Sequence, residues 1–258
     1  MNHRGFAIAL SMEAGNIMRK DFTLGMHKDW KEDNTPLTRT DVAINELVVD
    51  RVHDILPDHG VLAEEGSNFN GEEYVWVCDP IDGTNPFSHG YPTFTFSLAL
   101  VHRGQPILGL LYDPILGRLV VAESGKGALL TSPSRFIHDL PIKVSRSPLL
   151  TRSLVSIESG NPRFNKLRND LVDMGNHVAT FVCITYSSML VAMGEIAGAI
   201  WDGNTPWDAA AVQVIIEEAG GVCTNIEGEQ QRYDGPVKGI VVGPKEIHRQ
   251  LIEMIRKN

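Results

Sequence analysis

Two aspartates, three residues apart, are the clearest candidates for chemistry in this sequence. Asp79 and Asp82 follow the apolar run YVWVC at 74–78. We predict that Pro80 ends regular strand pairing there and that a turn brings both carboxylates to one side. Carboxylates held close repel each other unless a cation lies between them. Segment 79–84 therefore predicts metal ligands, with an Asp-rich turn at a strand end as the plainer alternative.

The two residues after Asp82 could serve an anionic ligand beside that metal. Gly83 has no side chain to block a close approach, and its amide and that of Thr84 could point at phosphate oxygens. The plainer interpretation of Thr84 is a turn hydroxyl. The segment thus combines hydrogen-bond donors for an anion with ligands for a metal ion.

Further acidic positions strengthen the metal hypothesis. Glu64 and Glu65 close the β-rich run VLAEE, and Asp208 opens an alanine-rich segment predicted to be a helix. A solvated strand edge would also explain the glutamates, and a helix cap would explain Asp208. Carboxylates without accompanying histidine or cysteine suit a hard cation, so the predicted metal is Mg²⁺ rather than Zn²⁺.

Charge and composition limit the classes of partner that this protein is expected to bind. The 258-residue chain carries a formal net charge of -9 and 43% hydrophobic residues. This acidity argues against a general affinity for nucleic acid or anionic membrane. No uncharged apolar run approaches the roughly 20 residues that span a bilayer. The three distant cysteines are typical of buried thiols in a reducing compartment, so we expect a cytoplasmic protein.

Helices and strands must position these residues. Apolar spacing of three and four predicts helices over 3–21 and 40–56, the second capped by Thr40. Short β-rich runs predict a sheet region over 61–124. Beyond about residue 150, strands and helices alternate, so helices should cover both faces of the sheets. The expected fold is α/β (α+β).

Four separated motifs occur along nearly the whole chain. They are KEDNTPLTRTD at 31–41, the glutamate pair at 64–65, DPIDGT at 79–84, and Trp207-Asp208 followed by small residues and Glu-Ala-Gly-Gly. SLAL, GLLYDP and AESGKGA follow the DPIDGT turn. The set resembles the inositol monophosphatase family, a Mg-dependent, lithium-sensitive phosphatase superfamily that includes fructose-1,6-bisphosphatases.

The resemblance implies a layered α-β-α-β-α sandwich with up to three Mg²⁺ ions between its sheets. We expect one such unit over 1–258, with approximate lobes 1–145 and 146–258.

By motif position, Glu64, Asp79 and the carbonyl of Ile81 would hold one ion. Asp79, Asp82 and Asp208 would hold a second, and Glu64 would assist a third. The implied activity is hydrolysis of a small phosphate monoester by a metal-activated water.

The resemblance also assigns catalytic residues. Asp41 and Thr84 match the pair that orients and deprotonates the attacking water, and Glu64 is counted with them. Without the resemblance, Asp41 would be an acidic residue at the positive end of its helix.

Two departures concern the organic part of the substrate. The family commonly has Gly-Ser where this chain has Val182-Cys183, and often a glutamate where this chain has Asp202. The predicted substrate-binding residues are Asp82, Gly83, Thr84, Cys183 and Asp202.

Inositol 1-phosphate is the first candidate substrate, because the overall pattern is closest to that branch and the 24–37 loop could close over a compact ligand. Fructose-1,6-bisphosphatase, histidinol-phosphatase and nucleotide 3'-phosphatase activities, known among relatives, are alternatives. A non-catalytic regulatory binding protein is less favoured, since all four metal carboxylates and Thr84 are present. The resemblance further implies a homodimer and inhibition by lithium.

Overall fold

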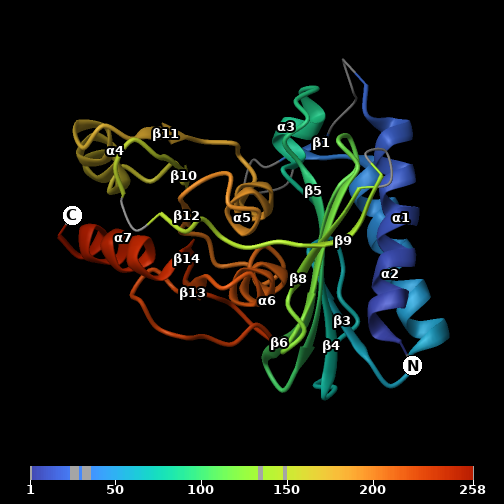
Figure 1. Ribbon diagram of the computed structural model, residues 1–258. Helices are drawn as coiled ribbons and strands as arrows, with labels where there is room; N and C mark the ends of the chain where they lie inside the picture. Colours follow the sequence, from blue (N-terminus) through green and yellow to red (C-terminus); the bar gives the residue numbers. More distant parts are fainter. Residues whose placement is uncertain (1, 24–28, 31–35, 133–135, 148–149, 258) are drawn as a thin grey trace.

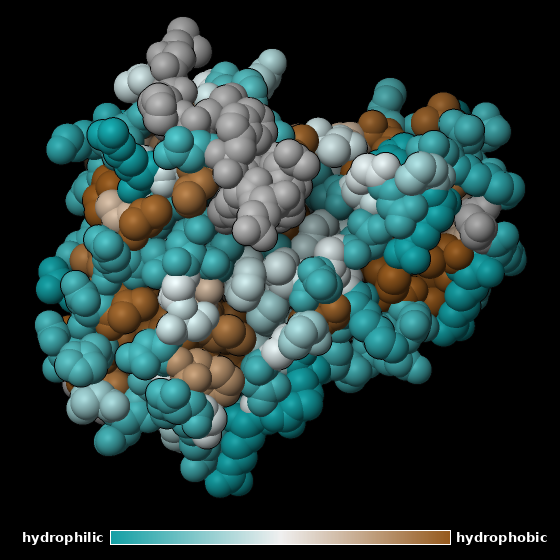
Figure 2. Space-filling model, turned by 180° about the vertical axis from the view of Figure 1, so that it is seen from behind, coloured by the Kyte–Doolittle hydropathy of each residue, from teal (hydrophilic) through white to brown (hydrophobic). Residues whose placement is uncertain are grey.

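The computed structural model describes residues 2–23, 29–30, 36–132, 136–147 and 150–257. Its helices and strands form five layers: two mixed sheets separated by a helical layer, each sheet covered on its outer face by helices (Figure 1). The predicted α-β-α-β-α sandwich is confirmed. Figure 2 shows the molecule from behind, with hydrophilic residues over most of this face and hydrophobic residues in small patches.

The first outer layer consists of α1 (His3–Asp21) and α2 (Arg39–Ile55). Helix α1 buries Ala7, Leu10, Ala14 and Met18 against the large sheet. Their spacing of three and four places them on one helical face, which is the pattern that predicted this helix. Both predicted helices agree with the structure to within one residue at each end.

The predicted cap of α2 was wrong. The cap is Thr38, not Thr40, because the helix begins at Arg39 and Asp41 becomes its third residue. Asp41 Oδ2 accepts hydrogen bonds from the Thr38 amide at 2.9 Å and from its hydroxyl at 2.6 Å. The hydroxyl of Thr40 instead donates to Asp21 at 3.0 Å.

The large sheet has the strand order β3-β4-β5-β6-β7-β8-β9. Its strands are β3 (Gly60–Ala63), β4 (Tyr74–Asp82), β5 (Thr95–His102), β6 (Gln105–Asp113), β7 (Arg118–Glu123), β8 (Ala128–Ser132) and β9 (Ile137–Pro141). The β3–β4 pair is parallel and the others are antiparallel. The sheet extends beyond the predicted 61–124 region by β8 and β9. The prediction missed β9 because this strand is mostly exposed and lacks the buried alternation that signals a strand.

The second sheet has the order β11-β10-β12-β14-β13. Its strands are β10 (Leu154–Glu158), β11 (His177–Ala179), β12 (Gly198–Trp201), β13 (Val222–Thr224) and β14 (Ile240–Gly243), and its outer face carries α4 (Phe164–Asp173) and α7 (Lys245–Lys257). Outside both sheets, β1 (Asp29–Trp30) pairs antiparallel with β2 (Pro36–Leu37). No helix in the described ranges is long and apolar enough to cross a membrane.

Between the sheets lie α5 (Ile184–Ala192) and α6 (Ala210–Glu218), both buried along most of their length (Figure 1). Gly109 of β6 permits this packing, since a Cβ there would lie 2.5 Å from the carbonyl oxygen of Ala211. One hydrophobic core joins residues of both sheets through these helices. The predicted lobe boundary after residue 145 falls between β9 and β10, and the domain division itself stays a prediction.

Candidate metal centre

A β-bulge brings Asp79 and Asp82 to the same side of β4. In a regular strand, residues three apart point to opposite faces. Here Asp79 pairs with Ser97 and Asp82 with Thr95, so two residues of β4 oppose one of β5. The extra residue reverses the alternation and places both carboxylates together. The sequence predicted that Pro80 ends regular strand pairing. The pairing with β5 is interrupted between Asp79 and Asp82, but it then resumes, so β4 continues through Pro80 to Asp82.

Glu64 reaches the same sheet edge from the neighbouring strand. Strands β3 and β4 run parallel, with Ala63 paired to Cys78, so Glu64 follows its strand where Asp79 follows Cys78. The Glu64 amide donates to the carbonyl of Cys78 at 3.3 Å. Parallel pairing therefore brings together two acidic residues that are far apart in sequence.

Asp208 joins Asp79 and Asp82 from the middle layer. It lies in the turn before α6, two residues ahead of Ala210, so it does not open the helix as the sequence suggested. Its carboxylate accepts a short hydrogen bond from the Thr205 hydroxyl. Asp79, Asp82 and Asp208 each offer one oxygen within 4.8 Å of the others, a group that could hold a metal ion.

The electrostatics of this group call for a cation. Burial raises the pKa of Asp79 well above its ordinary value, and the charges of Glu64 and Asp208 raise it further. Burial and the charge of Asp82 raise the pKa of Asp208 to about 8. Carboxylates this close and buried would be ionised together only beside positive charge. An all-oxygen donor set of this kind fits a hard divalent ion such as Mg²⁺.

Thr84 and Asp41 meet across 43 positions of sequence. Gly83, at φ 90°, turns the chain into the short helix α3 (Thr84–Ser88), which begins at Thr84. The Thr84 hydroxyl lies 3.1 Å from Asp41 Oδ1 and 3.0 Å from the Ile81 carbonyl oxygen, both acceptors. Burial raises the pKa of Asp41 to about 6, opposed by the hydrogen bonds from Thr38.

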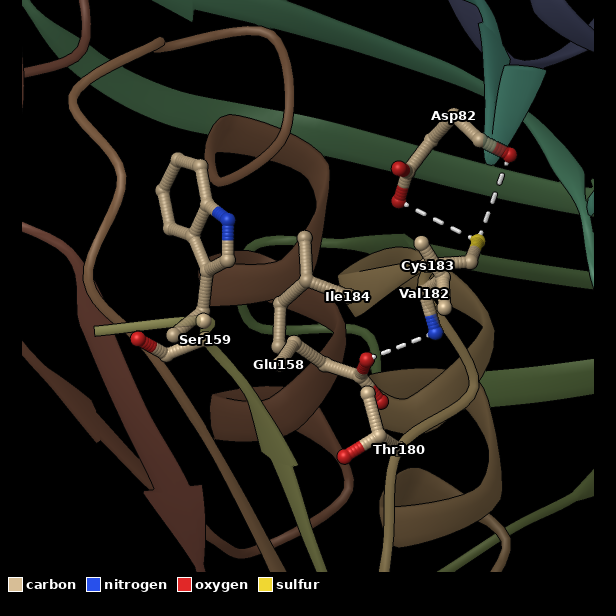
Figure 3. A pocket seen from close by; sticks show the side chains of 9 residues that line it. Asp82, Glu158, Ser159, Thr180, Val182, Cys183 and Ile184 are labelled. Atoms are coloured by element: carbon tan, nitrogen blue, oxygen red, sulfur yellow. Dashed lines mark hydrogen bonds between the residues drawn. The ribbon is translucent and has the colours of Figure 1, made fainter. Parts of the chain in front are cut away.

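Asp82 is also held from its far side. The amide and hydroxyl of Thr185 donate to Asp82 Oδ2 at 2.8 and 2.6 Å, and Cys183 Sγ lies 3.2 Å from the same oxygen. Figure 3 shows Cys183 pointing at Asp82. These contacts leave Asp82 Oδ1 for the metal group and explain why Cys183, the cap residue of α5, lies at the site.

A pocket of about 390 Å³ opens beside Asp82 and Cys183 (Figure 3). Its lining includes Glu158, which sequence reasoning missed. The available signal was weak: like Glu64, Glu158 closes a buried β-rich run. Asp202 is absent from the described lining of this pocket, and its carboxylate contacts Asn161 Nδ2 at 3.2 Å instead. Most of the predicted 24–37 loop lies outside the described residues.

Residues 2–258 match the Inositol monophosphatase family, and the chain belongs to that family. It is 35% identical to a histidinol-phosphatase of Chlorobaculum parvum, over 87% of this chain and 85% of the relative. It is 32% identical to inositol monophosphatase 1 of Solanum lycopersicum, over 88% of this chain and 85% of the relative. Family members are phosphatases, so this protein is a phosphoric monoester hydrolase.

Among solved structures, a Thermotoga maritima IMPase superposes with a TM-score of 0.89 at 27% identity, covering 100% of this chain and 98% of the other. The fold and the family thus agree over the whole length.

Proposed function

We propose that this phosphatase hydrolyses a small phosphate monoester with Mg²⁺, and that inositol 1-phosphate is its first candidate substrate. The observation that carries the proposal is the convergence of Asp79, Asp82 and Asp208, with Thr84 of the turn after β4 hydrogen-bonded to Asp41 of α2. A structural Asp-rich turn would not need all five residues in one place.

Glu64, Asp79, the carbonyl of Ile81, Asp82 and Asp208 would hold the metal. Bound Mg²⁺ would neutralise phosphate charge and lower the pKa of a coordinated water. The protein contributes the proton acceptor. The Thr84 hydroxyl donates to Asp41, so its oxygen can accept a hydrogen bond from the attacking water, and Asp41 takes the proton through Thr84.

The phosphate and the alcohol would lie on either side of Asp82. Gly83 and Thr84 offer their amides to phosphate oxygens at the start of α3. The alcohol part would enter the pocket beside Cys183. For Asp202 we propose only an indirect role, since its carboxylate is engaged by Asn161 and lies 3.7 Å from Arg163.

Histidinol phosphate is the second candidate substrate. The observation that favours it is the 35% identity to a histidinol-phosphatase, higher than the 32% to the tomato inositol monophosphatase. Fructose 1,6-bisphosphate and nucleotide 3'-phosphates are further alternatives on the same scaffold. We also propose a cytoplasmic homodimer that is inhibited by lithium.

A phosphate-release assay tests the proposal. Inositol 1-phosphate, histidinol phosphate, fructose 1,6-bisphosphate and adenosine 3',5'-bisphosphate are compared by kcat/KM at one Mg²⁺ concentration, with and without excess chelator and with added lithium. We expect Mg²⁺-dependent release, with a higher kcat/KM for the two monophosphates than for the two bisphosphates. Full turnover in excess chelator would contradict the metal mechanism. A strong preference for either bisphosphate would contradict the proposal that the substrate is a small phosphate monoester such as inositol 1-phosphate.

A further inference from the structure

The pocket beside Asp82 is acidic. Its lining contains two carboxylates, those of Asp82 and Glu158, and no lysine, arginine or histidine among the described residues. A cation held by Asp79, Asp82 and Asp208 would compensate charge on the Asp82 side only. The far end of the pocket therefore keeps a negative potential where Glu158 lies.

Glu158 is buried, with 7% of its surface exposed, and its carboxylate accepts hydrogen bonds from four neutral groups of the described residues. Oε1 accepts from the hydroxyls of Ser187, at 2.5 Å, and Ser156 and from the amide of Phe181 at 3.0 Å. Oε2 accepts from the amide of Val182 at 2.8 Å (Figure 3). A carboxylate oxygen has two lone pairs, so Oε2 can accept one further hydrogen bond from a ligand in the pocket.

The nearby cations are engaged elsewhere. Arg168 donates to the backbone carbonyls of Ile157 and Ser159, and Arg163 pairs with Asp202. Neither arginine lines the pocket. A positively charged ligand would therefore meet no competing cation of the described lining at Glu158.

The rest of the lining suits an organic cation. Trp201 lines the pocket beside Val182 and Ile184. An indole face attracts an ammonium or a protonated imidazole, and the aliphatic side chains cover its carbon atoms. A second phosphate would instead meet two carboxylates.

We propose that this pocket selects an amino-alcohol monophosphate, with Glu158 as the specificity-determining residue that receives the substrate's ammonium group. The inference rests on the proposed function, because the phosphate must lie at the metal group for the alcohol to enter this pocket. It places histidinol phosphate in the favoured class, and fructose 1,6-bisphosphate outside it.

A matched pair of substrates tests the inference on the unaltered protein. Serinol phosphate and glycerol 1-phosphate differ only by an ammonium in place of a hydroxyl. We expect kcat/KM to be at least about tenfold higher for serinol phosphate, since a charge-assisted hydrogen bond replaces a neutral one. Equal values, with Mg²⁺-dependent release from both, would overturn this inference and leave the proposed function intact. No release from either would overturn both.

Glu158→Gln tests the residue. The variant keeps the size of the side chain and removes its charge, so kcat/KM for serinol phosphate should fall about tenfold more than kcat/KM for glycerol 1-phosphate. Glu253→Gln, which removes the same charge from the exposed surface of α7, is the matched control and should keep the preference. An equal loss for both substrates in Glu158→Gln would overturn the inference, because Glu158 would then only hold the turn at Phe181 and Val182.

Discussion

At the scale of single residues, Asp41 accepts hydrogen bonds both from Thr38 at the start of α2 and from the Thr84 hydroxyl, for which we propose a catalytic role. Its ordinary pKa of 3.8 is raised to about 6 by burial. As a general base it must be ionised, so kcat/KM should fall as the pH drops below about 6. A carboxylate whose pKa is raised by folding adds stability below pH 3.8, and that stability is lost as the pH rises through 6.

We therefore expect Asp41→Asn to lower kcat by roughly a hundredfold or more at neutral pH. Its Tm should not fall, because asparagine keeps an acceptor for Thr38 and removes a buried charge. Steady-state kinetics and thermal melting check both points. Normal turnover with a much lower Tm would make Asp41 a helix-end residue and nothing more.

Asp208→Asn should separate stability from activity. With a pKa of about 8 against an ordinary 3.8, Asp208 stabilises the metal-free protein at low pH, and that stability is lost as the pH rises through 8. In chelator, the wild-type Tm should fall between pH 6 and pH 9, and the variant should melt higher at pH 9.

The same Asp208→Asn variant should lose most Mg²⁺-dependent activity, because a charged ligand is gone. Added Mg²⁺ should flatten the wild-type pH dependence of Tm. A variant that melts lower than wild type in chelator at pH 9 would show that the carboxylates do not repel one another.

At the scale of elements, the turn from β4 into α3 is the critical connection. Gly83 lies at φ 90°, and a Cβ there would approach the carbonyl oxygen of Thr93 to 2.8 Å. Asp82 and Thr84 flank this position, so a shift of the turn would move the proposed metal ligand and the proposed catalytic hydroxyl together.

Gly83→Ala should destabilise the protein by about 1–3 kcal/mol and lower kcat strongly. Gly125→Ala is the matched control, because Gly125 also has a positive φ, of 78°, but has nothing within 4 Å of the added Cβ and lies in a different turn. The control should lose some stability and keep its activity. Equal activity loss in both variants would argue against a special role for the β4–α3 turn.

At the scale of the whole molecule, the middle helical layer links the sheets and carries Asp208. Gly109→Ala would place a Cβ 2.5 Å from the Ala211 carbonyl oxygen and from Val214 Cγ1, which would push α6 away from the large sheet. We expect a loss of about 1–3 kcal/mol in unfolding free energy from overpacking.

The Gly109→Ala variant should also need more Mg²⁺ for half-maximal activity, since Asp208 lies two residues before α6. Chemical denaturation and Mg²⁺ titration measure the two effects. A lower stability with an unchanged Mg²⁺ requirement would mean that the position of α6 does not control the metal group.

The sequence by itself determined most of the helices and strands and the acidic residues of the candidate site. Helix and strand periods are local properties, so α1 and α2 could be read from apolar spacing alone. The motifs around Glu64, Asp79 and Asp208 indicated the family, which the comparisons confirm. Strands β8 and β9 were missed, the edge strand β9 because its residues are mostly exposed and carry no such period.

Only the tertiary structure decided how these residues meet. The bulge between Asp79 and Asp82 depends on pairing with β5, and the place of Glu64 depends on the parallel alignment of β3 with β4. The hydrogen bond from Thr84 to Asp41 joins residues that are 43 positions apart in the sequence. The carboxylate of Glu158 is held at the pocket by hydrogen bonds from Phe181 and Ser187, more than 20 residues later in the sequence, and from Ser156, two residues earlier. Such contacts depend on strand register and layer packing, which no local pattern of residues encodes.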